Sequence, residues 1–212
     1  MPMTERKSVA ALGFGDSLTA GTPGYDPTTG YGNQQSQYGY WLVKKAREER
    51  QLTLKFDNEG VPGELSRHML PRLHSILSIH GYAIVVILGG SNDLGWGDEP
   101  DRVFGYLKNL WQYALDKGSH VIACTIPPVG MPYPPLQEAQ LRLNEMITEG
   151  LRGQDSEHVV DLFAALSNER GLLRAEFDSG DGLHMSEYGY RQMGERIWMD
   201  GIKRMLDSSR IH

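Results

Sequence analysis

The sequence predicts an α/β protein in which helices cover both faces of a parallel β-sheet. Apolar runs of strand length alternate along the chain with longer amphipathic segments, and such alternation is typical of parallel sheets. Several runs are apolar almost throughout, as expected for strands that are buried on both faces. Because ligands of such sheets bind beyond the carboxyl ends of the strands, the residues that follow each strand are the first candidates for a functional site.

Five apolar runs are predicted as strands, at 9–14, 52–58, 83–89, 120–126 and 158–162. The amphipathic segments predict helices near 37–50, 64–79, 101–117, 135–152 and 186–206. The last helix carries apolar residues at helical spacing, which we interpret as a core-facing stripe: Tyr190, Met193, Ile197, Trp198, Ile202 and Met205. The Gly/Pro-rich loop 22–37 and the Pro-rich loop 127–135 are long enough to be functional, although a stiff surface connection explains the second equally well.

Composition narrows the class of protein. The 212 residues are enough for one substantial core, so we expect a single domain over 1–212. The net charge of −6 argues against a nucleic-acid partner. No apolar stretch reaches membrane-spanning length and no secretory leader is visible, so we expect a cytoplasmic protein, with a removed leader left open. The lone Cys124 excludes an intrachain disulfide, and the sequence is silent on oligomeric state.

Polar and glycine residues follow each of the first three predicted strands, and more precede the last helix. Taken singly, each has a structural explanation. Ser17 could cap a helix, Asn58 could form an Asx turn, and Asn92 could bond its own loop. His184, which lies near Asp181, could be a half-buried histidine without chemistry.

Together these residues supply the groups that acyl transfer needs. Ser17 is a candidate nucleophile and His184 a candidate base, because imidazole accepts protons near neutral pH. Asp181 lies three residues before His184 and can orient its ring. The backbone N–H groups of Ser17 and Gly63 and the side-chain amide of Asn92 are candidate donors to an oxyanion.

Four short blocks in this order resemble the SGNH (GDSL) hydrolase family. They are Gly15-Asp16-Ser17-Leu18, the pair Asn58 and Gly63, Gly90-x-Asn92-Asp93, and Asp181-x-x-His184. The resemblance implies a three-layer α/β/α, flavodoxin-like fold with a five-stranded parallel sheet and no metal or organic cofactor. It also implies ester hydrolysis through an acyl-enzyme, with the roles given above.

The resemblance also separates two glycines in the second block. The oxyanion donor of the family follows the asparagine by five positions, which selects Gly63, and we interpret Gly60 as a turn glycine. Asp161 is the one alternative acid, because it ends the fifth predicted strand. Five other histidines are expected to be structural or exposed: His68, His74, His80, His120 and His158.

Several aromatic residues lie on or near the loops that we expect around Ser17. They are Tyr25, Tyr31, Tyr38, Trp96 and Tyr133. Aromatic walls suit sugars, aryl esters and acyl chains alike, and some of these rings could simply pack the loops together. All but Tyr38 are predicted to bind substrate.

The favoured function is that of a serine esterase acting on small or medium carboxylic esters, with acetyl and short acyl groups preferred. Carbohydrate O-acetylesterase, thioesterase and lysophospholipase activities use the same groups and stay open. A flavodoxin-like module that binds phosphate or nucleotide is the alternative from another class, but the chain has no Gly-x-x-x-x-Gly-Lys-Ser/Thr motif. A catalytically dead family member is disfavoured because every catalytic group is present.

Overall fold

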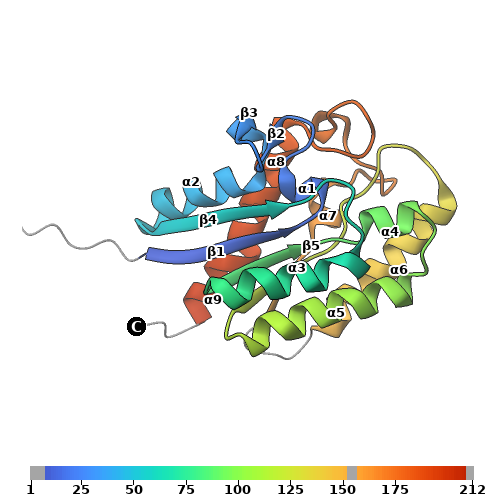
Figure 1. Cartoon of the computed structure of the whole chain (residues 1–212). Helices are drawn as coiled ribbons and strands as arrows, with labels where there is room; N and C mark the ends of the chain where they lie inside the picture. The colour runs from blue at the N-terminus through green and yellow to red at the C-terminus, as the bar shows by residue number, and fades with distance from the viewer. Residues whose placement is uncertain (1–7, 152–156, 209–212) are drawn as a thin grey trace, which may run out of the picture.

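A five-stranded parallel sheet forms the centre of the molecule (Figure 1). The computed structural model describes residues 8–151 and 157–208. Its strands are β1 (Ser8–Gly15), β4 (Thr53–Gly60), β5 (Ile84–Leu88), β6 (His120–Cys124) and β7 (Glu157–Val160). They pair in the order β4-β1-β5-β6-β7, and every pairing is parallel. This confirms the predicted parallel sheet, and the strand order is that of flavodoxin-like folds.

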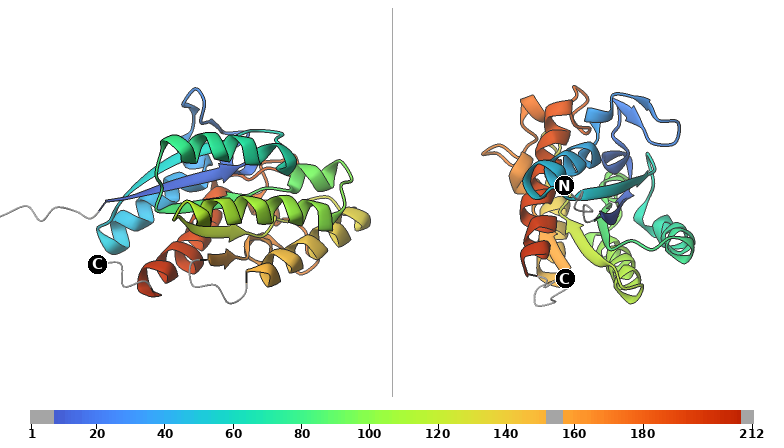
Figure 2. Two further views of the ribbon diagram at one scale, coloured as in Figure 1. Left: turned by 60° about the horizontal axis from the view of Figure 1, so that its bottom comes forward. Right: turned by 90° about the vertical axis from the view of Figure 1, so that its left-hand side faces the viewer.

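Helices cover both faces of the sheet, which gives the three layers (Figure 2). One face carries α2 (Tyr38–Arg50), α7 (Leu162–Leu166), α8 (Glu187–Arg196) and α9 (Lys203–Ser208). The other carries α3 (Ser66–Ile79), α4 (Ser91–Gly95), α5 (Pro100–Asp116) and α6 (Pro134–Gly150).

The two hydrophobic cores follow from the alternation of side chains along each strand. In β5, Ile84, Val86 and Leu88 face the core beneath α2 and α8. The intervening Val85 and Ile87 face the core beneath α3 and α5. All five side chains are buried, which explains why this strand has no polar face in the sequence.

The predicted helices are present with small shifts at their ends. The helix expected at 135–152 is α6, which ends at Gly150, and residue 152 lies outside the described residues. The helix expected at 186–206 consists of α8, a π-helical turn over Ile197–Ile202, and α9. Its apolar stripe is buried as predicted.

Several short elements were not predicted. They are α1 (Ser17–Ala20), α4, α7, the hairpin of β2 (Tyr25–Asp26) and β3 (Tyr31–Gly32), and 3₁₀ turns at Gln34–Ser36 and Ala175–Phe177. The fifth strand ends at Val160 because Asp161 caps α7 instead of extending the strand. In α1, Asp16 accepts the N–H of Leu18, and Gly21 closes the helix at φ 105°.

Candidate active site

Four segments that are distant in the sequence meet where β1 and β5 end. The chain leaves β1 toward the β4 side of the sheet and returns through β5 on the opposite side. This change of direction opens a crevice at the carboxyl edge of a parallel sheet. The arrowheads of β1, β4 and β5 point to that edge in Figure 1.

Ser17 is the first residue of α1, directly beyond the end of β1. The residue that caps this helix is Asp16, so the possibility that Ser17 is the cap is wrong. The side chain of Ser17 is almost fully buried, with 6% of the residue exposed. Its Oγ lies 3.0 Å from Nε2 of His184, a distance suited to proton transfer between the two groups.

His184 is held from its other side by Asp181. Nδ1 of His184 lies 2.7 Å from Oδ2 of Asp181. The remaining oxygen, Oδ1, accepts the backbone N–H groups of Leu183 and His184 at 2.9 Å and 2.8 Å. The carboxylate therefore shapes the turn and fixes the orientation of the ring that follows it.

The same contacts keep Asp181 ionised. Desolvation raises the pKa of this carboxyl group. The hydrogen bonds from the backbone and side chain of His184 and from the N–H of Leu183 outweigh that effect and lower the pKa to about 2. Two glycines with positive φ, Gly180 and Gly182, allow the turn to reverse before His184.

The three candidate oxyanion donors each keep an N–H hydrogen that is not bound to the described part of the chain. Within residues 8–151 and 157–208, the backbone N–H groups of Ser17 and Gly63 meet no hydrogen-bond acceptor. The Nδ2 group of Asn92 donates to the carbonyl oxygen of Glu64 at 3.0 Å, which leaves its second hydrogen available. Asn92 therefore contacts the second block rather than its own loop.

The second block is shaped by Asn58. Its Oδ1 accepts the N–H of Gly60 at 3.0 Å, the Asx contact expected from the sequence. Its Nδ2 donates to the carbonyl oxygens of Thr19 and Ala20, which ties β4 to α1. Gly60 is the last residue of β4 rather than a turn glycine, and a Cβ there would lie 2.1 Å from the backbone N of Ala20.

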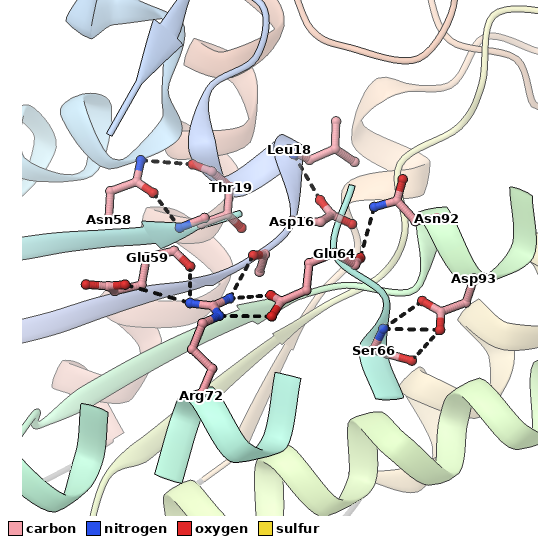
Figure 3. Close-up of polar contacts among 12 residues, drawn as sticks. Asp16, Leu18, Thr19, Asn58, Glu59, Glu64, Ser66, Arg72, Asn92 and Asp93 are labelled. Carbon is pink, nitrogen blue, oxygen red and sulfur yellow. Dashed lines mark hydrogen bonds and ion pairs between the residues drawn. The ribbon is translucent and has the colours of Figure 1, made fainter. Parts of the chain in front are cut away.

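Two further acids, Asp16 and Asp93, directly adjoin Ser17 and Asn92 in the chain, and Figure 3 shows their contacts. Asp93 is fully buried and accepts both the backbone N–H and the hydroxyl of Ser66. It thereby caps α3 from a different element. Asp16 is also fully buried. Burial, and after it the negative charges of the nearby Asp93 and Glu64, raise the pKa of Asp16 to about 7, although the hydrogen bond from the N–H of Leu18 lowers it.

A cavity of about 430 Å³ lies beside these residues. Asn92 and Asp181 form part of its wall, whereas Ser17 and His184 do not line it. The cavity therefore borders the Asp181 side of the site, because Asp181 contacts His184. Most of the remaining wall is apolar and comes from three segments: Leu94, Trp96, Ile126, Val129, Met131, Tyr133, Leu136 and Leu183. Val129, Met131 and Tyr133 belong to the Pro-rich loop 127–135, so this loop forms part of the cavity wall.

The predicted aromatic residues divide into two groups. Trp96 and Tyr133 line the cavity and stay 83% and 60% exposed. Tyr25 lines a separate groove along β4, and Tyr31 is exposed on the β2–β3 hairpin, so the structure does not bring either to the cavity. Tyr38 is fully buried with its hydroxyl toward Thr19, and it is a core residue rather than part of a rim.

The remaining candidates have structural contacts. Asp161 accepts the hydroxyl of Thr125 and the N–H of Ala164, so it caps α7 and does not reach His184. Cys124 is buried, and burial raises the pKa of its thiol. In the described part of the chain, no group of three or more His, Cys, Asp or Glu side chains is arranged to hold a metal ion. Nor does any helix there combine the length and hydropathy needed to cross a membrane.

Sequence comparison relates the chain to known acylhydrolases. A model of the family described as GDSL-like lipase/acylhydrolase matches residues 14–192. Platelet-activating factor acetylhydrolase IB subunit alpha1 of Bos taurus is 28% identical over 137 residues, covering 63% of this chain and 57% of that protein. The protein of the same name from Pongo abelii is also 28% identical. The match spans a little over half the length of these curated relatives.

Solved structures share the fold. A protein of the G-D-S-L family from Desulfitobacterium hafniense has a TM-score of 0.74 at 17% identity, covering 90% of this chain and 98% of its own. An acetyl-xylooligosaccharide esterase from Geobacillus has a TM-score of 0.73 at 18% identity, covering 93% and 96%. The esterase EstA from Pseudoalteromonas has a TM-score of 0.69 at 20% identity, covering 93% and 98%.

Proposed function

We propose that the chain, which belongs to the GDSL-like lipase/acylhydrolase family, is a hydrolase of ester bonds that cleaves small or medium carboxylic esters through an acyl-enzyme on Ser17. The observation that carries this proposal is the continuous series of contacts from Ser17 Oγ through His184 to Asp181. A serine hydroxyl is inert without such a base.

The proposed chemistry has two halves. Nε2 of His184 removes the proton of Ser17 as Oγ attacks the ester carbonyl carbon, and the same proton then passes to the departing alcohol. In the second half, water attacks the acyl-enzyme, gives its proton to Nε2, and Ser17 leaves with that proton. In both halves the N–H groups of Ser17, Gly63 and Asn92 stabilise the oxyanion.

The cavity beside Asn92 supports a carboxylic ester with a short or medium apolar part. Its volume of about 430 Å³ is at the lower end of the range for small-molecule sites. Its apolar walls favour an acyl chain over a sugar, whose hydroxyl groups would need more polar partners. The 28% identical acetylhydrolase supports the same choice of a small acyl group.

The first test is the substitution Ser17→Ala, measured with p-nitrophenyl acetate, butyrate and octanoate. Loss of the nucleophile should lower kcat by at least about 10⁴-fold on all three esters. Ser78→Ala is the matched control, because Ser78 is an exposed serine of α3. It should leave the rates unchanged.

A covalent probe provides the second measurement. An alkyl fluorophosphonate should add one adduct to the wild-type chain, located at Ser17 by peptide mass spectrometry, and none to Ser17→Ala. Full ester hydrolysis by Ser17→Ala would contradict the proposal. A nucleotide that raises the Tm in a ligand screen, combined with no turnover of any ester, would favour the binding-module alternative.

A further inference from the structure

Arg72, on the second turn of α3, extends toward the ends of β1 and β4 (Figure 3). Nη1 donates to the carbonyl oxygen of Glu59 at 2.8 Å, and Nη2 donates to that of Gly15 at 3.2 Å. Nε donates to Oε1 of Glu64 at 3.0 Å, while Nη2 also contacts Oε2 of the same carboxylate. The guanidinium lies 4.1 Å from the centre of the Phe14 ring. One side chain thus binds the ends of β1 and β4 and the loop that follows β4.

Glu64 connects these contacts of Arg72 to Asn92, in the segment Gly90-x-Asn92-Asp93. It follows Gly63 directly, its carboxylate is held by Arg72, and its carbonyl oxygen accepts Nδ2 of Asn92 at 3.0 Å. The Gly15 carbonyl held by Arg72 lies two positions before Ser17. Each of the three candidate oxyanion donors is therefore separated by at most two residue positions or one hydrogen bond from Glu64 or from the Gly15 carbonyl that Arg72 contacts.

The chemistry of the two side chains suits a fixed arrangement. The planar guanidinium holds a carboxylate in a two-pronged contact and still donates to carbonyl groups, which a lysine ammonium cannot reproduce in one geometry. The Glu64 side chain is 10% exposed and that of Arg72 is 22% exposed. A carboxylate this well covered depends on its partner, because an unpaired charge in such a place is strongly unfavourable.

We propose that Arg72 and Glu64 are positioning residues for the oxyanion donors. They touch neither the ester nor the nucleophile, and they fix the distances between the N–H groups of Ser17, Gly63 and Asn92. The inference rests on the proposed function, because those donors matter only if an oxyanion forms. Misplacing donors by about 1 Å can lower a rate by about 100-fold.

Three variants test the inference on the full chain with p-nitrophenyl butyrate. Arg72→Met should lower kcat by about 10- to 100-fold while KM changes less than about threefold, because the donors act mainly in the transition state. Arg72→Lys should recover only part of the loss. Glu64→Gln keeps the backbone carbonyl for Asn92 and should give an intermediate loss. Arg142→Met is the control, because Arg142 forms an exposed pair with Glu145 on α6.

A double-mutant cycle separates positioning from general damage. In an Asn92→Ala background, Arg72→Met should cost at least about threefold less in kcat than in the wild type, since one of the donors it positions is already absent. Active-site titration with a fluorophosphonate gives the fraction of competent enzyme, so that kcat is counted per active site. If Arg72→Met does not fold, Glu64→Gln and Arg72→Lys in the same cycle give the answer.

Three results would overturn the inference. They are an unchanged kcat in Arg72→Met, a loss confined to KM or to the competent fraction, and strict additivity with Asn92→Ala. None of them affects the proposed function, because Ser17→Ala would still abolish hydrolysis in each case. Activity of Ser17→Ala would instead overturn both.

Discussion

Asp16 and Asp181 are two aspartates at the same site with opposite environments. Asp181 is partly exposed and receives three hydrogen bonds, so it stays a carboxylate down to strongly acidic pH. Asp16 is fully buried and receives one N–H on Oδ1, while Oδ2 has no partner among the described residues. The difference follows from solvation and from the number of donors, not from the residue type.

The raised pKa of Asp16 predicts a pH-dependent stability. The unfolded carboxyl group loses its proton near pH 4, whereas burial holds the proton in the folded state up to about pH 7. The unfolded chain then binds fewer protons between these values, so the free energy of unfolding falls as pH rises from 4 to 7, by roughly 4 kcal/mol in total. Asp16→Asn should remove this decline, as urea unfolding at pH 5 and pH 8 would measure.

Asp101→Asn provides the comparison for that experiment. Asp101 is an exposed acid in the first turn of α5, and its replacement should leave the pH dependence of the wild type in place. Parallel curves for the wild type and Asp16→Asn would show that Asp16 does not titrate in this range.

For single residues, the sequence indicated the candidate reacting groups but not the side chains that hold them in place. Ser17, Asn92 and His184 could be predicted because each follows a strand or precedes the last helix in a fixed order. Arg72 could not, because an arginine within a helix is ordinary and only the fold brings it to Gly15 and Glu64. Tyr38 was placed on the rim by its position in the chain, but the register of α2 turns it into the core.

The helix α1 is only four residues long, and its neighbours hold it in place. Asp16 caps its start, Asn58 of β4 binds the carbonyl oxygens of Thr19 and Ala20 near its end, and the hydroxyl of Tyr190 reaches the carbonyl of Thr22 at 2.7 Å. A helix this short has little intrinsic stability. Its position therefore depends on the close approach of β4 and α8.

At Gly60, the last residue of β4, the backbones of β4 and α1 come very close together. A Cβ at this position would meet the backbone N of Ala20 at 2.1 Å and its Cα at 2.5 Å. Gly60→Ala should therefore push α1 away from β4, destabilise the protein by about 1–3 kcal/mol, and lower kcat beyond the loss of folded protein. Thermal unfolding and active-site titration would measure the two effects separately.

Gly105→Ala is the matched substitution on a helix with free space. Gly105 lies in α5, and apart from its neighbours in the chain and the backbone of its own helix no described atom comes within 4 Å of the added Cβ. This variant should be more stable by about 0.5–1 kcal/mol because alanine restricts the unfolded chain. If Gly60→Ala were as stable and as active as the wild type, α1 would not be held by this contact.

The long elements were predictable and the short ones were not. The five strands and five long helices each carry an apolar pattern of their own, such as the uninterrupted run of β5. The helix α4 and the β2–β3 hairpin have no such pattern. Local contacts of Asp26 with Thr28 and Thr29 close the hairpin, whereas α4 is tied to a distant segment. Asp93 illustrates this, because its link to Ser66, 27 positions away, joins the start of α3 to α4.

The cavity beside Asn92 is formed by the whole molecule, because its walls come from α4, the loop after β6, the first turns of α6 and the turn before α8. Leu136, in the first turn of α6, lies half-buried on that wall. Leu136→Trp should fill part of the cavity and lower kcat/KM for p-nitrophenyl octanoate at least about tenfold more than for the acetate. The ratio of the two values is the measurement.

Leu141→Trp is the control on the same helix, at a position that is 52% exposed. It should leave the ratio of octanoate to acetate hydrolysis unchanged. Equal losses on both esters in Leu136→Trp would mean that the acyl chain lies elsewhere and that the cavity holds the alcohol part or no part of the substrate.

The nucleophile and its proposed base are 167 positions apart in the chain. During synthesis, Ser17 emerges early, and at about 5–20 residues per second the ribosome needs roughly 10–30 s more to reach His184. Until then the nascent chain has a serine without a partner and no means of attacking an ester. If Ser17 and His184 act as proposed, hydrolysis begins only when the segment that carries His184 docks beside α1, so ester turnover would report that step of folding.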